Sequence, residues 1–500
     1  MLLSRSVGLI RQSIFSHYFG LSDAGDAFTQ AFRIPNLLQN LFGEGVLSAS
    51  FIPVYANLLA RREKALAQEV AGAIAAILGL LTSVLVLFGV LATPILIDAI
   101  APGFQGQKRE LTVHLVRTLF PGAGLLVMSA WCLGILNSHR QFFLAYASPV
   151  LWNIAMIATL LYYGPGSAEE SLAVVLAWGS VAGSLLMFVV QLPAVFRSAG
   201  RTPLSLGRRS SDVRTILSNF GPVFISRGVV QLSAYIDLMI SSWLPSGAPT
   251  ALNNAQLLYM LPVSLFGMTI SAAELPAMSS LLGSDSDIAK QLRQRLNASL
   301  QRIAFFTIPS VAAFLALGDV IAAAIFQSGR FKHADSTYVW QILAGSAVGL
   351  LASTMGRLYS STYYALKDTR TPLRFAIIRV TLTTILGYLC ALPLPRALGL
   401  DPRIGAAGLT ASAGIAGWIE FLLLRHSLNK RIGSTGLPAA IAVKLWSAAI
   451  LGAAAAWAVK LAIGPHHPWI VAAAVLGPFG IIYLGATYSM GLARYPRALR

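Results

Sequence analysis

Long apolar runs separated by short polar gaps are the feature that most limits how this chain can fold. A helix that crosses a bilayer needs about 20 mostly apolar residues. The stretches that meet this requirement are 2–22, 26–59, 69–100, 111–136, 143–163, 171–196, 216–244, 252–282, 297–326, 336–366, 373–395, 404–424, 437–462 and 468–491. Soluble domains have about 25% charged residues, whereas this chain has 11% and a mean hydropathy of +0.69. We therefore predict an all-α polytopic membrane protein with about 14 transmembrane helices.

Basic residues are distributed unevenly between the gaps, and this asymmetry predicts the orientation of the chain. When alternate gaps are assigned to opposite sides of the membrane, one side has 22 Lys and Arg residues and the other has 8. Cytoplasmic loops contain the excess of positive charge in membrane proteins, so we expect both termini to be cytoplasmic. These loops, and their contact with anionic lipid headgroups, explain the net charge of +18. We expect no nucleic-acid partner.

The most basic gap separates two similar parts of the sequence. It covers residues 197–215, and we predict that it is a cytoplasmic linker. IPNLLQNLFGEGVLSASFIPVY, which begins at Ile34, resembles LPVSLFGMTISAAELPAM, which begins at Leu261, in the same orientation. A parallel repeat of this kind is typical of alternating-access transporters with a site between two lobes. We predict an N-lobe of six helices over 1–196, a C-lobe of six over 216–428, and two further helices over 429–500.

Charged residues interrupt the apolar stretch from Asp26 to Tyr55. Asp26, Arg33 and Glu44 lie within it, although each charge at the centre of a bilayer costs about 2.5–3.5 kcal/mol. Charges at this depth usually face the interior of a helix bundle or a water-filled cavity. We predict that this stretch lines a polar path through the protein. The alternative is a buried ion pair that only fixes packing.

Within the first two apolar runs, 2–22 and 26–59, three arginines accompany two acids. Arg5 and Arg11 lie in the first apolar run, where they either extend toward the lipid headgroups or line a broad cavity with Arg33. A guanidinium group matches phosphate oxygens in a bidentate manner. A cationic cavity therefore favours an anionic substrate such as a phosphate or diphosphate, with Asp26 and Glu44 holding the arginines in place.

Sequence motifs of catalysis are missing from the chain. It contains no Walker loop, no HExxH and no GxSxG, and Cys132 and Cys390 give neither a disulfide framework nor metal-ligand spacing. We therefore expect a transporter rather than an enzyme, without a cofactor. Transport would be driven by an ion gradient or by the membrane potential.

Several ordered motifs resemble one known family. The stretch DAFTQAFRIPNLLQNLFGEGVLSASFIPVY resembles the signature of the MurJ (MviN) family of lipid II flippases, in the MOP exporter superfamily. APGF at 101–104, ILNSHRQFFLAYASPVLWNI ending at Ile154, GRF at 329–331 and YALKDTRTP at 364–372 match in the same order. The resemblance implies two six-helix lobes and a lipid-tail groove formed by the last two helices. It also implies an undecaprenyl-diphosphate-linked glycopeptide substrate, moved from the inner to the outer leaflet of the bacterial cytoplasmic membrane during cell-wall biogenesis.

The resemblance also assigns roles to individual residues. Its substrate-binding positions fall on Arg5, Arg11, Asp26, Arg33, Asn36 and Glu44. An acid that some members use in a sodium site falls on Asp237, but its partner positions are Thr383 and Gly387. Such residues are poorer ligands for a hard cation than Asn or Asp. We expect the protein to act as a monomer surrounded by membrane lipids.

Three positions depart from the family pattern. Gln12 and Gln39 stand where the family has charged residues, and Leu257 stands where an arginine is expected to bind the diphosphate. These departures leave the exact lipid-linked substrate open. We hypothesise that Arg227, in the preceding apolar run, supplies the missing positive charge.

Other functions remain as alternatives. The same scaffold could export a different polyprenyl-diphosphate-linked glycan, which the leucine at position 257 favours. It could also exchange a drug for cations, but acids rather than arginines should then dominate the cavity. A membrane scaffold that recruits cell-wall enzymes is a third alternative, and extended soluble domains would favour it.

Overall fold

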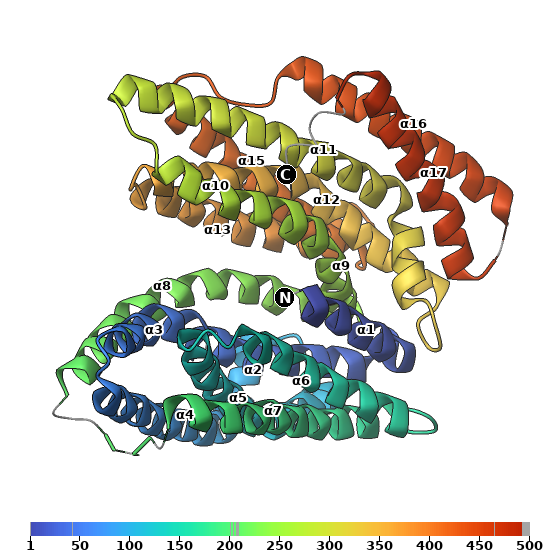
Figure 1. The fold of residues 1–500 in the computed structure, drawn as a ribbon. Helices are drawn as coiled ribbons and strands as arrows, with labels where there is room; N and C mark the ends of the chain where they lie inside the picture. The colour runs from blue at the N-terminus through green and yellow to red at the C-terminus, as the bar shows by residue number, and fades with distance from the viewer. Residues whose placement is uncertain are drawn as a thin grey trace. The chain divides into compact units, whose positions relative to one another are not determined.

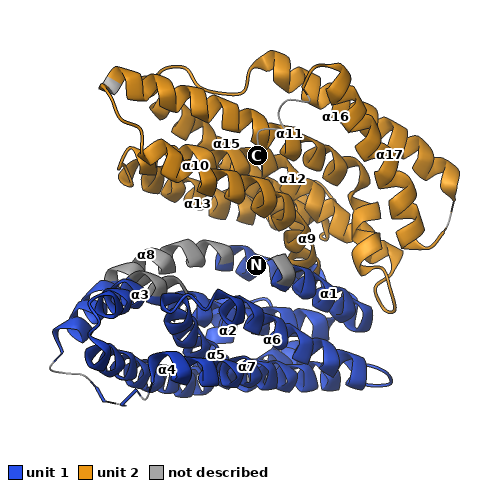
Figure 2. Ribbon diagram, in the orientation of Figure 1, with its two compact units in different colours: residues 1–250 blue, residues 251–500 orange. Residues whose placement is uncertain are grey.

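A computed structural model describes residues 2–42, 44–200, 202–203, 205–206, 210–464 and 466–492. Within these ranges, only the backbone is described at residues 2–3, 44–46, 48–49, 222–234 and 285. The regular elements of the described chain are helices, as the apolar runs predict (Figure 1). The chain forms two compact units, Met1–Thr250 and Ala251–Arg500 (Figure 2). The two units are described separately below.

The first unit is built around one helix that is buried along most of its length. Its helices are α1 (Leu2–Phe19), α2 (Asp23–Phe42), α3 (Glu44–Ala60), α4 (Lys64–Ile100), α5 (Gly106–Ser138), α6 (Phe142–Tyr163), α7 (Glu169–Ala199) and α8 (Ser211–Ser241). Helix α5 packs against α2, α4 and α7. In its most apolar segment 78% of residues are buried, compared with 28% in α4. Helix α5 is therefore the core of the unit, and α4 is peripheral.

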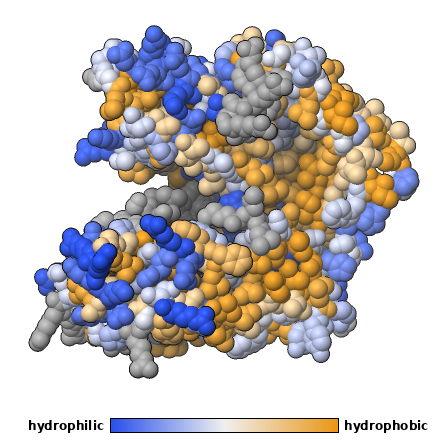
Figure 3. Space-filling model, viewed as in Figure 1, coloured by the Kyte–Doolittle hydropathy of each residue, from blue (hydrophilic) through white to orange (hydrophobic). Residues whose placement is uncertain are grey.

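The outer face of α4 has the character of a lipid-facing surface. Large apolar side chains are exposed on it at helical spacing, namely Leu80, Val84, Leu87, Phe88, Leu91 and Ile95. Figure 3 shows broad hydrophobic areas on the visible face of each unit. An apolar stripe of this kind would be unfavourable in water, but it is the surface that lipid tails require.

The second unit repeats this plan around another helix. Its elements are α9 (Ala248–Pro262, whose first turn belongs to the first unit), the π-helix η1 (Val263–Met268), α10 (Thr269–Ser279), α11 (Asp285–Phe326), α12 (His333–Ala365), α13 (Arg370–Ala391), α14 (Pro393–Ala397), α15 (Ile404–Ile432), α16 (Ala439–Ile463) and α17 (Pro468–Ser489). Helix α12 is central and packs against α11 and α15. The last two helices pack against each other and against α11.

Eleven described helical segments are long and apolar enough to cross a membrane, so the chain is a multi-pass membrane protein. The number of fourteen spans stays a prediction. The predicted span 26–59 is helical on both sides of residue 43, which lies outside the described residues, and each side has an internal proline, Pro35 in α2 and Pro53 in α3. A proline inside a helix removes one backbone hydrogen bond, which interrupts regular packing.

The division between the units differs from the predicted linker. The first unit ends at Thr250, and α8, which begins at Ser211, packs against α3 and α4 within it. The linker at 197–215 stays a prediction. The predicted arrangement of two six-helix lobes and two C-terminal helices stays a prediction.

Candidate functional site

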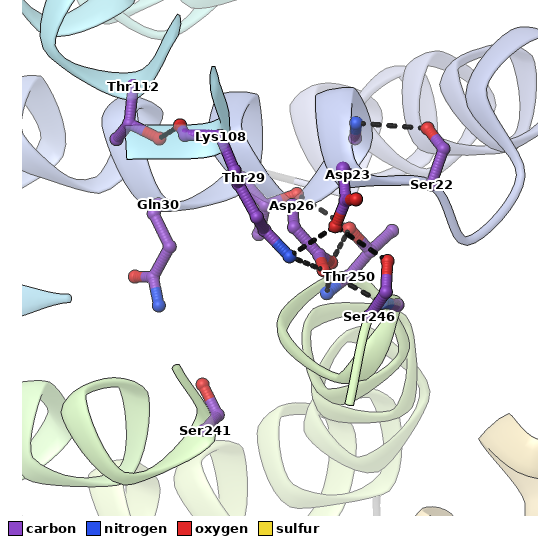
Figure 4. A network of polar contacts seen from close by, with 12 residues as sticks. Ser22, Asp23, Asp26, Thr29, Gln30, Lys108, Thr112, Ser241, Ser246 and Thr250 are labelled. Atoms are coloured by element: carbon purple, nitrogen blue, oxygen red, sulfur yellow. Dashed lines mark hydrogen bonds and ion pairs between the residues drawn. The ribbon is translucent and has the colours of Figure 1, made fainter. Parts of the chain in front are cut away.

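Asp26, near the beginning of α2, is a densely hydrogen-bonded charge in the first unit. Its side chain is fully buried. Oδ2 accepts hydrogen bonds from Lys108 Nζ and from the Gly247 amide, both at 2.7 Å. Oδ1 accepts from the amide of Thr250 at 3.0 Å and from its hydroxyl at 2.8 Å (Figure 4). Four donors therefore surround one carboxylate.

Two features of the neighbouring helices bring these donors together. Gly247 and Thr250 lie at the beginning of α9, where backbone amides have no partner within the helix and attract negative charge. Lys108 lies in the first turn of α5, and its ammonium group also contacts Asp23 at 2.7 Å. Asp26 thus joins the N-terminal ends of α2, α5 and α9.

This geometry corrects one expectation from the sequence. Asp26 was predicted to hold an arginine, but its cationic partner is Lys108. The two residues are 82 positions apart, and Lys108 belongs to a polar gap rather than to an apolar run. The sequence does indicate that Asp26 needs a cationic partner, because an acid inside an apolar run must be paired. It does not indicate which segment supplies that partner.

Arg11 lies in a different environment, formed by aromatic and thioether groups. Its guanidinium carbon is 5.0 Å from the centroid of the Phe32 ring and 5.9 Å from that of Trp152. The two rings are nearly parallel, with centroids 5.3 Å apart. Nη1 of Arg11 contacts Met156 Sδ at 3.6 Å. Cation–π attraction of this kind holds a guanidinium in place without neutralising its charge.

The charge of Arg11 has no carboxylate partner among the side chains that the structure describes. The ion pairs of the first unit there involve Lys108 and Arg109. Arg11 is partly accessible, so a positive group on α1 is oriented by α2 and α6 and remains available to an anion. A role of Arg11 in substrate binding stays a prediction.

The charge of Arg33, unlike that of Arg11, has an acid as a neighbour in the described chain. It is half-buried in α2, its backbone carbonyl accepts a hydrogen bond of 2.9 Å from the Tyr235 hydroxyl, and its side chain interacts electrostatically with Asp237. Asp237, the predicted cation ligand, therefore has a cationic neighbour. No group of three His, Cys, Asp or Glu residues suited to a metal ion occurs in the described ranges.

The other predicted site residues are placed as follows. Arg5 is exposed on α1, and Asn36 is half-buried in α2. The side chains of Glu44 and Arg227 lie outside the described residues. Leu257, at the position where the family has an arginine, is half-buried in α9.

An apolar groove lies on the second unit between α11 and α16. Its volume is about 380 Å³, and Leu315, Trp446, Ile450 and Trp457 are among the residues that line it. The family resemblance implied a lipid-tail groove formed by the last two helices. The groove described here involves α16 but has α11, rather than α17, as its second wall.

The helix order and the membrane-spanning lengths define a multi-pass transporter fold. The chain is similar to a solved structure named "Lipid II flippase MurJ, inward closed conformation", with a TM-score of 0.80 and 23% identity over 100% of this chain and 98% of that one. It is also similar to an inward-facing multidrug resistance MATE family transporter of the MOP superfamily, with a TM-score of 0.68 and 17% identity over 86% and 96% of the two chains.

The family model described as "Lipid II flippase MurJ" matches residues 15–479. The lipid II flippase MurJ of Burkholderia cenocepacia is 31% identical over 438 residues, which cover 86% of this chain and 82% of the relative. A probable lipid II flippase MurJ of Rickettsia prowazekii is 28% identical over 473 residues, covering 93% and 88%. The chain belongs to the lipid II flippase MurJ family.

Proposed function

We propose that this chain translocates lipid II, the lipid-linked peptidoglycan precursor, from the inner to the outer leaflet of the bacterial cytoplasmic membrane by alternating access. Membership of the MurJ family supports the substrate class. The observation that carries the proposal is the position of Arg11. Its guanidinium is fixed by two aromatic rings and has no acidic partner among the described side chains.

An unpaired guanidinium inside a membrane protein is costly unless it faces water or an anion. Two acids of the first unit are already engaged, because Asp26 contacts Lys108 and Asp237 interacts with Arg33. An incoming diphosphate therefore does not have to displace a carboxylate from Arg11. Bidentate pairing of guanidinium with phosphate oxygens would provide both affinity and orientation.

We further propose that the protein acts as a monomer without a cofactor, with both termini in the cytoplasm. An ion gradient or the membrane potential would drive the cycle. Moving one elementary charge across 100 mV changes the free energy by about 2.3 kcal/mol, which is enough to shift a two-state equilibrium substantially.

The test is complementation of a bacterium depleted of its own flippase. We expect the wild-type chain to restore growth and Arg11→Ala to abolish rescue at equal membrane expression. Arg33→Ala should reduce rescue less, because Asp237 already balances part of the Arg33 charge. Arg197→Ala, at an exposed arginine near the end of α7, is the matched control and should behave as wild type. Full rescue by Arg11→Ala would refute the proposal.

Leu257 supports a second candidate, an exporter of another polyprenyl-diphosphate-linked glycan. Purified protein in liposomes can be supplied with fluorescent lipid II or with a polyprenyl-diphosphate glycan of different sugar composition. Faster translocation of the second lipid would favour this candidate. A drug exporter driven by cation exchange is less well supported, because Asp26 is enclosed by four donors and is not available to a cation.

A further inference from the structure

A second group of charged residues lies inside the second unit, on three of its helices. Arg379 Nε on α13 is 3.0 Å from Glu420 Oε2 on α15. Arg357 on α12 interacts electrostatically with both of these residues and with Tyr259 on α9. The Tyr259 hydroxyl is 2.8 Å from Ser353 Oγ, one helical turn before Arg357. We refer to these five residues as the α12 cluster.

The α12 cluster lies well inside helices that are long enough to cross the membrane. Arg357 is eight residues before the end of α12, and Arg379 is nine residues after the beginning of α13. At a rise of 1.5 Å per residue, both are roughly 12–14 Å from the nearest helix end. Ionisable groups at such depth face a bundle interior or a watery cavity and are associated with substrate pathways.

The charges of the α12 cluster do not cancel. It contains two arginines and one glutamate, and the short ion-pair contact of Glu420 is with Arg379. Arg357 is exposed and forms no ion pair with a carboxylate in the part of the chain that the structure describes. The Tyr259 and Ser353 hydroxyls, which are hydrogen-bonded to each other, add polar groups next to this uncompensated positive charge, and Ser353 Oγ is also 3.1 Å from the Leu350 carbonyl oxygen.

We propose that the α12 cluster is a binding site for a phosphate-type oxyanion. Arg357 and Arg379 would supply the positive charge, the Tyr259 hydroxyl would donate one hydrogen bond while accepting one from Ser353, and Glu420 would hold Arg379 in position. The oxyanion comes either from the diphosphate of the transported lipid, an assignment that rests on the proposed function, or from the headgroup of a bilayer lipid. The cluster would give the second unit a cationic site despite the leucine at position 257.

The decisive experiment measures binding rather than transport, with the full-length protein in nanodiscs of phosphatidylcholine. Undecaprenyl diphosphate is titrated against wild type, Arg357→Gln and Arg379→Gln. We expect at least a tenfold loss of affinity for Arg357→Gln and a similar or smaller loss for Arg379→Gln. Arg374→Gln, the same substitution at an exposed arginine earlier in α13, is the control and should change affinity less than twofold.

A fourth variant separates a binding role from a packing role. Glu420→Gln removes the only acid of the α12 cluster and should strengthen binding several-fold, whereas a network that only holds helices together would lose thermal stability with unchanged affinity. Arg357→Lys should retain part of the affinity. Wild-type affinity for both undecaprenyl diphosphate and phosphatidylglycerol in both arginine-to-glutamine variants, with folding confirmed by their Tm, would overturn the proposal.

The source of the oxyanion is resolved by a parallel titration with phosphatidylglycerol. Loss of undecaprenyl diphosphate binding alone in Arg357→Gln supports the assignment to the substrate. Loss of phosphatidylglycerol binding alone supports the oxyanion site but overturns that assignment. The binding assay does not depend on transport. If the wild-type protein binds the oxyanion but fails to rescue growth, the proposed function is contradicted and the proposed oxyanion site is not.

Discussion

Asp26 and Arg11 are both charged, both lie in the first unit and both were predicted as site residues, yet their surroundings are opposite. Asp26 is fully buried, and its two oxygens accept four hydrogen bonds. Arg11 is partly accessible and is held by two rings and a thioether. A saturated charge fixes helices, whereas a charge that is oriented but not neutralised can still bind a ligand. The two residues should therefore respond differently to substitution.

The largest expected loss of stability follows removal of the Asp26 carboxylate. Asp26→Ala leaves Lys108 and two α9 amides without their partner, and breaking a buried ion pair costs about 3–5 kcal/mol. We expect a loss near the lower end of this range, because Asp23 still contacts Lys108. The measurement is the Tm of the purified protein in detergent, followed by tryptophan fluorescence.

Paired substitutions show whether charge or hydrogen bonding dominates at Asp26. Asp26→Asn keeps one acceptor oxygen and should cost less than Asp26→Ala. The double variant Asp26→Asn with Lys108→Met should be more stable than the sum of the two single changes implies, since neither charge remains unpaired. Strict additivity of the two changes would contradict a direct interaction.

Thr250→Val is expected to have an intermediate effect. It removes the hydroxyl that donates to Asp26 Oδ1 but keeps the backbone amide that donates to the same oxygen. Hydrogen bonds to charged groups contribute about 1.5–3 kcal/mol, and the remaining donor should place the loss near the lower value. The same thermal assay measures it, with Thr215→Val, an exposed threonine on α8, as the control.

Arg11→Ala should reduce stability much less than Asp26→Ala does, but it should abolish function. Cation–π contacts are worth about 0.5–2 kcal/mol, so we expect only a small decrease in Tm, together with loss of rescue in the complementation assay. Arg11→Lys keeps the charge but loses the planar, bidentate geometry and should rescue partially. A large drop in Tm for Arg11→Ala would show that Arg11, like Asp26, is mainly structural.

The smallest expected effect concerns Asp368, an acid outside the membrane-spanning helices. The amide and hydroxyl of Thr371 and the guanidinium of Arg431 lower the pKa of Asp368 from 3.8 to about 2. Because the pKa is depressed, this stabilisation is present above about pH 4 and is lost as the pH falls toward 2. Ion pairs at exposed positions contribute at most about 1 kcal/mol.

Thermal unfolding between pH 6 and pH 2.5 tests this contribution. The Tm of the wild type should fall more steeply than that of Asp368→Asn below pH 4, because the variant has no carboxylate to protonate. Identical slopes would contradict the role of Asp368. The contrast with Asp26 would show how much more a buried acid contributes than an accessible one.

The sequence predicts the helical membrane fold well, because bilayer length and apolar character leave few alternatives. It does not predict which helices form the core. Apolar residues are largely exposed on α4 and packed against other helices on α5, and an apolar run by itself does not show whether its residues will face lipid or a neighbouring helix. The π-helical turn η1 was also not predicted, since it depends on local backbone geometry within an apolar run.

The sequence predicts only part of the candidate site, and the reason is similar. A charge inside an apolar run marks Asp26 and Arg11, but it does not identify their partners, because Lys108, Phe32 and Trp152 come from distant segments. The same signal marks Arg357, which was not singled out from the sequence. Its significance becomes apparent only when α13 and α15 place Arg379 and Glu420 beside it.

The Asp26 site also has a consequence for how the chain is made. Asp26 and Thr250 are 224 residues apart, so the site cannot be complete when the first helices leave the ribosome. Roughly 140 residues separate Lys108 from Thr250, and at about 5–20 residues per second their synthesis takes about 7 to 30 s. During this interval the carboxylate has Lys108 but not the α9 donors. The Asp26 site is therefore complete only after the first turn of α9 has been synthesised.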